Sequence, residues 1–232
     1  MVPTHIFING CSFLAYRPKD DIMTHAGIEL QKLMNLKHGG AIAGGGRGNK
    51  RLSVTTKVWC QRNQKLAKKC FFVIGITSGT RFDYPTNDGY KKKKFPDLKT
   101  TWRTVTPQQY ASQVTNFFKY LFTQGLDMDQ MIQLESIEAT LNLQNFLKVN
   151  KYPYVMYNTL SNTPIENEDV KALFDIIDKK RFFKPETSHY DFITENNLIA
   201  SKKDPHPSVE GHKRWAEQLL EFIDANNLRT IE

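Results

Sequence analysis

Two side chains far apart in the sequence have the chemistry of a nucleophile and its general base. Ser12 lies in a glycine turn that directly follows the apolar run 6–8. A hydroxyl at the carboxyl end of a buried strand has backbone N–H groups beside it that can stabilise a developing negative charge. Glycine-serine turns also end many strands for reasons of backbone geometry alone. A catalytic role for Ser12 therefore depends on partners elsewhere in the chain.

The candidate partner is His206, which stands between Pro205 and Pro207 near the carboxyl end of the chain. The two prolines restrict the backbone on both sides of the imidazole. Histidine is the usual base that takes a proton from serine, and a nearby carboxylate such as Asp204 can fix its tautomer. The alternative is a surface histidine in a proline-rich turn.

The remaining histidines and cysteines do not indicate a metal site. The three cysteines show no CxxC spacing, and their odd number favours a reducing compartment over a disulfide framework. No helical ligand pair occurs among the six histidines, which are His5, His25, His38, His189, His206 and His212. We therefore expect no metal and no other cofactor.

Strands and helices alternate along the chain. Strand-like apolar stretches occur at 6–8, within 39–48, at 70–76 and at 152–157. Helical periodicity covers 20–36, 51–69, 107–123, 128–149, 168–179 and the segment from 207 onward. This alternation predicts an α/β protein: a three-layer α/β/α sandwich with a mainly parallel, flavodoxin-like central sheet of about five strands.

Two of these strands end in small polar residues. The run at 70–76 leads into Thr77 and Ser78, much as the first strand leads into Ser12. Open α/β sheets bind their ligands beyond the carboxyl ends of the strands. The glycine-rich stretch 44–48 suits either a close backbone approach to a ligand or a flexible turn. It lacks the Gly-Lys-Ser/Thr of a Walker loop, so a nucleotide-binding domain is the least favoured interpretation.

Length and composition predict one domain over residues 1–232, with loop insertions near 81–106 and 180–205. With 40% hydrophobic residues, the chain can bury one sizeable core. The segment 81–106 is aromatic and lysine-rich without clear periodicity, and we expect it to determine specificity. No apolar run reaches the ~18 residues of a membrane span, and no signal peptide is evident, which predicts a cytoplasmic protein with no membrane partner.

The net charge of +8 favours anionic partners but is concentrated in short runs such as Lys91–Lys94. Such runs usually form solvated surfaces. Nucleic acid is accordingly a less favoured partner than a small-molecule or carbohydrate substrate, and the oligomeric state is left open. Arg81, just after the strand 70–76, is a candidate to bind an anionic part of a substrate, or else a surface charge paired with Asp83.

The chain resembles the SGNH hydrolases, the superfamily of GDSL-type esterases, from end to end. The sequence Gly10-Cys11-Ser12-Phe13 stands where the family has Gly-Asp-Ser-Leu, so Ser12 takes the position of the nucleophile. Gly46 falls on the glycine of the second block, whose N–H lines the oxyanion hole. Gly75-Ile76-Thr77-Ser78 falls on the family's Gly-x-Asn-Asp.

The last block of the family supplies the base before a carboxyl-terminal helix, and His206-Pro207-Ser208 resembles it. By this resemblance the catalytic residues are Ser12, His206 and Asp204. The oxyanion hole is formed by Ser12, Gly46 and Thr77, while Asn49 echoes the second block and contacts substrate together with Arg81.

Three positions depart from the family pattern. Thr77 replaces the oxyanion asparagine and offers only a short hydroxyl donor. Lys203 stands three residues before the histidine, where the family has its aspartate, so His206 would be oriented either by Asp204, two residues before it, or by a backbone carbonyl. Cys11 replaces the aspartate beside the nucleophile.

The function expected from the residues and the resemblance is hydrolysis of an ester or O-acetyl group, including one on a carbohydrate. His206 would deprotonate Ser12, and water would later release the acid. The alternative is a protein that keeps the fold without the activity and binds a glycan or another anionic ligand, since fold alone does not establish function.

Overall fold

Five parallel strands form the central sheet of the computed structural model, which describes residues 2–17, 22–86, 101–105, 120, 123–125, 127–160 and 167–230. The order across the sheet is β2, β1, β3, β6, β7, and every neighbouring pair is parallel. The strands are β1 (His5–Asn9), β2 (Lys37–Ala41), β3 (Cys70–Ile76), β6 (Tyr154–Asn158) and β7 (Phe182–Ser188). This arrangement confirms the predicted parallel sheet.

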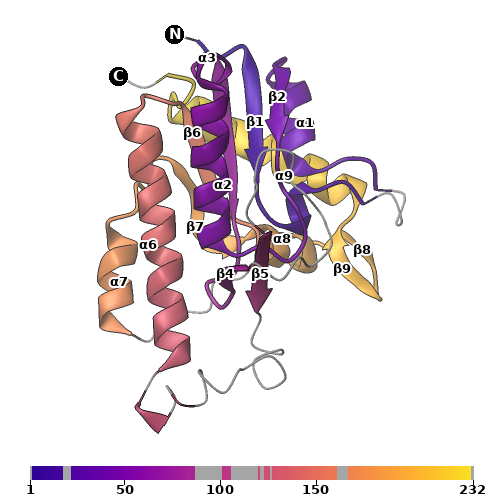
Figure 1. Ribbon diagram of the computed structural model, residues 1–232. Helices are drawn as coiled ribbons and strands as arrows, with labels where there is room; N and C mark the ends of the chain where they lie inside the picture. Colours follow the sequence, from indigo (N-terminus) through magenta and orange to yellow (C-terminus); the bar gives the residue numbers. More distant parts are fainter. Residues whose placement is uncertain are drawn as a thin grey trace.

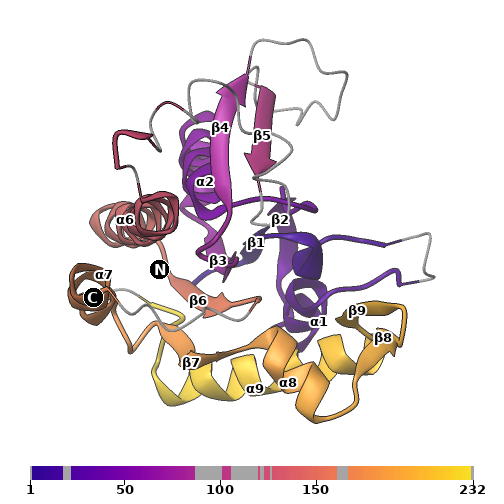
Figure 2. The same ribbon diagram turned by 90° about the horizontal axis from the view of Figure 1, so that it is seen from below.

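Helices cover both faces of the sheet (Figure 1). One face packs against α2 (Asn49–Arg62), α6 (Met128–Val149) and α7 (Glu168–Asp175), with the short α3 (Gln64–Ala67) after α2. The other face packs against α1 (Ala26–Leu33), α8 (His189–Glu195) and α9 (Val209–Ala225). Figure 2 shows the two helical layers on opposite sides of the strands, which confirms the predicted three-layer sandwich.

The sheet has two hydrophobic cores because successive side chains of a strand point to opposite faces. Ile6, Ile8 and Phe71 pack in the core on the α1 and α9 side. Phe7 and Phe72 pack in the core on the α2 and α6 side. All 7 residues of β3 are buried, which explains its uninterrupted apolar sequence.

The prediction of an irregular insertion near 180–205 was wrong. This segment contains β7, α8, and an antiparallel hairpin of β8 (Ile199–Ser201) and β9 (Asp204–Pro207). The strand β7 lies at the edge of the sheet, where Lys184 and Glu186 are exposed and Pro185 is tolerated. An edge strand with polar and proline residues lacks the apolar run that marks a central strand.

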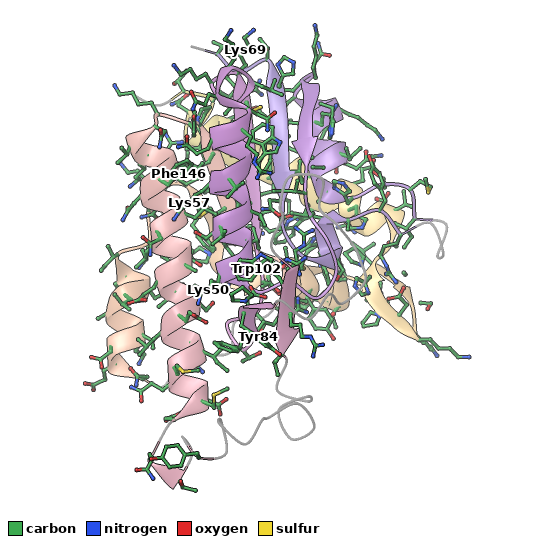
Figure 3. The ribbon with its side chains drawn as sticks, viewed as in Figure 1. Lys50, Lys57, Lys69, Tyr84, Trp102 and Phe146 are labelled. Carbon is green, nitrogen blue, oxygen red and sulfur yellow. The ribbon has the colours of Figure 1, made fainter. Side chains whose placement is uncertain are left out.

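The prediction for 81–106 was also wrong at both ends of the segment. Phe82–Thr86 forms β4 and Thr101–Val105 forms β5, and the two pair as an antiparallel hairpin. Figure 3 shows Tyr84 and Trp102 of this hairpin near Lys50, at the amino-terminal end of α2. Residues 87–100, the middle of the segment, lie outside the described residues.

Helix boundaries differ from the predicted ones at the first helix. The helix expected over 20–36 spans only Ala26–Leu33, because His25 caps it by accepting a hydrogen bond from the Ile28 N–H. The helix expected over 107–123 falls on residues that, apart from 120 and 123, lie outside the described part of the chain. Among the helices in the described part, none is long and apolar enough to cross a membrane.

Candidate active site

Ser12, His206 and Asp204 are connected by hydrogen bonds. The Ser12 Oγ lies 2.8 Å from the His206 Nε2, and the His206 Nδ1 lies 2.7 Å from the Asp204 Oδ1. Ser12 begins a short 3₁₀ helix, η1 (Ser12–Leu14), directly beyond β1. The structure therefore brings together the three residues to which the sequence assigns the catalytic role, in the order nucleophile, base, carboxylate.

The unusual spacing of Asp204 and His206 is explained by the strand on which they lie. Residues two apart on a β-strand have side chains on the same face. Both residues belong to β9, so the carboxylate of Asp204 reaches the imidazole of His206 directly. The same Asp204 oxygen also accepts a hydrogen bond from the backbone N–H of His206 at 3.2 Å. A carboxylate two residues before His206 thus contacts the Nδ1 of its imidazole.

Arg17 holds the other oxygen of this carboxylate. Its Nη2 lies 2.5 Å from the Asp204 Oδ2, and both side chains are about four-fifths buried, with exposed fractions of 18% and 20%. The ion pair with Arg17, followed by the hydrogen bonds from His206, lowers the pKa of Asp204 to about 2. The carboxylate is therefore ionised at neutral pH. Arg17 could not be identified from the sequence, because nothing near it in the chain indicates a carboxylate partner.

The turn before Ser12 is fixed by the side chain of Asn9. Its Oδ1 accepts the Gly10 N–H at 2.9 Å, and its Nδ2 donates to the hydroxyls of Thr55 and Thr56 on α2, each at 2.9 Å. A Cβ on Gly10 would lie 2.7 Å from a methyl carbon of Leu14 and 3.2 Å from the Gly75 carbonyl oxygen, so the close packing at this turn favours glycine. The turn that leads into Ser12 is thus held by a buried polar contact with α2.

The glycine-rich loop lies against this turn. The Gly44 N–H donates to the Gly10 carbonyl at 3.1 Å, and a Cβ built on Gly45 would lie 3.9 Å from the Cβ of Ser12. Gly46, the glycine expected in the oxyanion hole, follows with a positive φ of 68°. The structure therefore places Gly45, which was not predicted from the sequence, beside Ser12, and Gly46 is the next residue in the chain.

Asn49 joins the start of α2 to the carboxyl end of β3. Its Oδ1 accepts the Thr77 N–H at 2.9 Å, and its Nδ2 donates to the Thr77 carbonyl at 3.0 Å and to the Ser136 Oγ at 2.7 Å. In this conformation the Asn49 amide is engaged by the protein itself. The expected contact between Asn49 and substrate stays a prediction.

Thr77 directly follows β3, which is the parallel neighbour of β1, the strand that leads into Ser12. The Thr77 Oγ1 is buried and has no hydrogen-bond partner among the described residues. A hydroxyl with this placement is suited to donate to an oxyanion.

Arg81 contacts the glycine loop. Its Nη1 donates to the Arg47 carbonyl at 3.1 Å, so the side chain predicted to bind an anionic substrate group holds the loop in this structure. Arg47 itself is buried, and its Nη1 donates to the Ile42 carbonyl. The glycine loop is thus held by two further hydrogen bonds. The carbonyl of Arg47 accepts one from Arg81, and the side chain of Arg47 donates one to the carbonyl of Ile42, just after β2.

Asp83 on β4 caps α2 from a distant part of the chain. Its carboxylate accepts the Gly48 N–H at 3.0 Å, the Arg51 N–H at 2.9 Å and the Thr104 hydroxyl. The side chain is 1% exposed, and burial raises its pKa. The β4–β5 hairpin is therefore fastened to the helix that follows the glycine loop. This cap could not be predicted from local sequence, because Asp83 and Gly48 are far apart in the chain.

Two buried histidines lie behind the site. His189 stacks on Trp215 with ring centroids 4.8 Å apart, and His212 lies 5.5 Å from His189. Burial lowers the pKa of His189 to about 3 and that of His212 to about 2. Phe13 packs against both His189 and the outer His206, at centroid distances of 5.5 and 5.2 Å. Of these three histidines, only His206 is hydrogen-bonded to Ser12.

The residues of the site do not form a metal cluster. Within the described ranges, no group of three or more His, Cys, Asp or Glu side chains is placed to hold a metal ion.

Comparison of the sequence with protein-family models and with curated proteins gives no match.

Proposed function

We propose that this protein is a serine hydrolase that cleaves an ester or O-acetyl group, including one carried by a carbohydrate. The single observation that supports this proposal most is the hydrogen-bonded series Ser12–His206–Asp204, with distances of 2.8 and 2.7 Å. The resemblance to the SGNH hydrolases supports it independently, because the same three residues were selected from the sequence.

In the first step, His206 Nε2 takes the proton of the Ser12 hydroxyl while Oγ attacks the carbonyl carbon of the ester. The resulting imidazolium is stabilised by Asp204, which stays ionised because Arg17 lowers its pKa to about 2. Collapse of the tetrahedral intermediate breaks the bond to the alcohol, and His206 returns the proton to the alcohol oxygen. The acyl group is then bonded to Ser12.

In the second step, His206 takes a proton from water, and the hydroxide attacks the acyl carbon. Collapse of this intermediate releases the carboxylic acid and returns the proton to Ser12. In both steps the negative oxygen is held by the N–H of Ser12 and the glycine loop at Gly45 and Gly46, with the hydroxyl of Thr77 as a further donor.

The first test is hydrolysis of p-nitrophenyl acetate and of acetylated sugars. We expect the wild-type protein to release acid from at least one of them, and Ser12→Ala to lose more than about a thousandfold in kcat. The control is Ser201→Ala, at an exposed serine of β8. Wild-type activity that persists in Ser12→Ala would contradict the proposed mechanism.

A wild-type protein without hydrolytic activity would support the alternative of a binding protein. In that case we expect an anionic glycan to bind more weakly as salt is raised, because the net charge is +8. If the affinity for the anionic glycan does not change with salt, binding through the positive charge is contradicted.

A further inference from the structure

Arg47 is the only residue with a side chain in the glycine-rich run 44–48, which lies beside Ser12. Glycine has more backbone freedom than any other residue, so a run of this composition needs contacts outside its own backbone to keep one conformation. The side chain of Arg47 is fully buried, with an exposed fraction of 0%. A fully buried arginine is uncommon, and it needs partners for its N–H groups.

The Arg47 side chain folds back against its own loop. Its Nη1 donates to the carbonyl of Ile42, in the segment that leads from β2 into the loop. The guanidinium also packs on Gly44, because a Cβ built there would lie 2.8 Å from its Nη2 and 2.9 Å from its Nε. The absence of a side chain at Gly44 thus leaves the space that the guanidinium occupies.

The same guanidinium reaches the turn that leads into Ser12. Its Nη1 lies 3.5 Å from the Oδ1 of Asn9, the oxygen that also accepts the Gly10 N–H. The Gly44 N–H joins loop and turn a second time by donating to the Gly10 carbonyl. Arg47 therefore contacts both backbone segments that hold the negative oxygen in the proposed mechanism, which are the glycine loop and the turn at Ser12.

We propose that Arg47 is a positioning residue, which keeps the glycine loop in the place beside Ser12 that stabilisation of the oxyanion requires. This inference rests on the proposed hydrolase function and adds a residue to it. Arg47 acts through the loop and not on the substrate, so its loss should affect the transition state more than the bound ester. The expected signature is a lower kcat with little change in KM.

The first variant is Arg47→Ala, assayed on p-nitrophenyl acetate. We expect kcat to fall by about a hundredfold, which is the effect of losing one oxyanion donor. Arg47→Lys keeps one charged donor for the Ile42 carbonyl and should recover part of this loss. The matched control is Arg62→Ala, at an exposed arginine in the last turn of α2, which should keep the wild-type kcat.

Gly44→Ala tests the same contact from the other side and decides the question if Arg47→Ala folds poorly. Its Cβ would take the space of the guanidinium, so kcat should fall by at least about tenfold. The matched control is Gly79→Ala, because a Cβ on Gly79 would meet no atom closer than 3.6 Å. Gly44→Ala added to Arg47→Ala should cost little more, because the guanidinium that it displaces is already absent.

The outcomes separate this inference from the proposed function. If the wild type cleaves no ester and Ser12 does not react with a fluorophosphonate, the hydrolase function fails and the role of Arg47 fails with it. If the wild type is active and Arg47→Ala and Gly44→Ala are equally active, the hydrolase stands and the inference is overturned.

Urea unfolding of each variant distinguishes positioning from a purely structural role. If the loss of activity equals the loss of folded protein, or if the effects of Arg47→Ala and Gly44→Ala add fully, the inference is also overturned. A lower kcat of the folded protein at unchanged KM, partly recovered by lysine, supports it.

Discussion

The guanidinium of Arg17 lies 2.5 Å from Asp204, on the carboxylate oxygen that does not face His206. Arg17 follows the turn that carries Ser12, whereas Asp204 lies on the hairpin of β8 and β9 near the carboxyl end of the chain. This ion pair thus joins the segment of Ser12 to the segment of His206. It also keeps Asp204 ionised, as the proposed orienting role of this carboxylate requires.

Asp204→Asn should lower kcat by about a thousand- to ten-thousandfold with little change in KM, because the amide favours the wrong tautomer of the imidazole. Steady-state kinetics on the best ester measures this. A loss of less than tenfold would contradict the orienting role of Asp204.

Arg17→Gln should lower kcat by about tenfold, since Asp204 loses one of the two groups that hold it. Arg17→Lys, which retains the positive charge, should recover part of this loss. If Arg17 has only a structural role, its substitution should lower stability, and lysine should not restore kcat. If the two variants have equal unfolding curves, any difference in kcat between them comes from the site itself.

Thr77→Val should lower kcat by about a hundredfold, because one oxyanion donor is lost. The Thr77 hydroxyl has no hydrogen-bond partner among the described residues, so its removal should not destabilise the fold. Thr77→Ser keeps the hydroxyl and should retain most of the activity. If Thr77→Val is as active as the wild type, the oxyanion is held by backbone groups alone.

Asp83→Ala should lower the free energy of unfolding by about 2–4 kcal/mol, because buried N–H groups at the start of α2 lose their acceptor. Urea unfolding measures the difference. Asp129→Ala is the matched control: this residue is an exposed acid in the first turn of α6, and its loss should cost less than about 1 kcal/mol. Equal losses for the two variants would contradict the capping role of Asp83.

Acid should destabilise the protein through His189 and His212. Their pKa values, lowered by burial to about 3 and about 2, lie below the ordinary value of 6.5. Below pH 6.5 the histidines of the unfolded chain bind protons that those of the folded chain do not. The free energy of unfolding therefore keeps the full contribution of the neutral histidines above pH 6.5 and decreases below it. The slope is at most about 1.4 kcal/mol per pH unit for each histidine.

Urea unfolding at pH 7.5, 6.5 and 5.5 checks this dependence, and His212→Phe should make the slope between pH 6.5 and 5.5 shallower. Equal free energies of unfolding at pH 7.5 and 5.5 in the wild type would contradict the burial of neutral histidines.

The central strands and the Ser12–His206 pair were predictable because their signals are local. The uninterrupted run of apolar residues in β3 indicates a buried strand without any knowledge of its neighbours. The histidine between two prolines is likewise recognised from three consecutive residues. The orienting role of Asp204 was harder to predict, because its spacing departs from the family pattern. It follows from the extended backbone of β9, which puts both side chains on one face.

The contacts of Arg17 and Asp83 were not predictable in this way. Each pairs with a group from a distant segment, and only the packing of hairpins against the sheet and α2 brings the partners together. The edge strand β7 was missed for a related reason: Pro185 and two charged residues interrupt its apolar pattern, and only its pairing with β6 makes it a strand.

The most direct test of the nucleophile is labelling with a fluorophosphonate, which reacts with activated serine hydroxyls. Intact mass and peptide mapping should show one adduct, on Ser12, that is absent from Ser12→Ala and at least a hundredfold slower to form in His206→Ala. A protein that stays unlabelled, or a Ser12 adduct that forms at the same rate without His206, would contradict the catalytic pair.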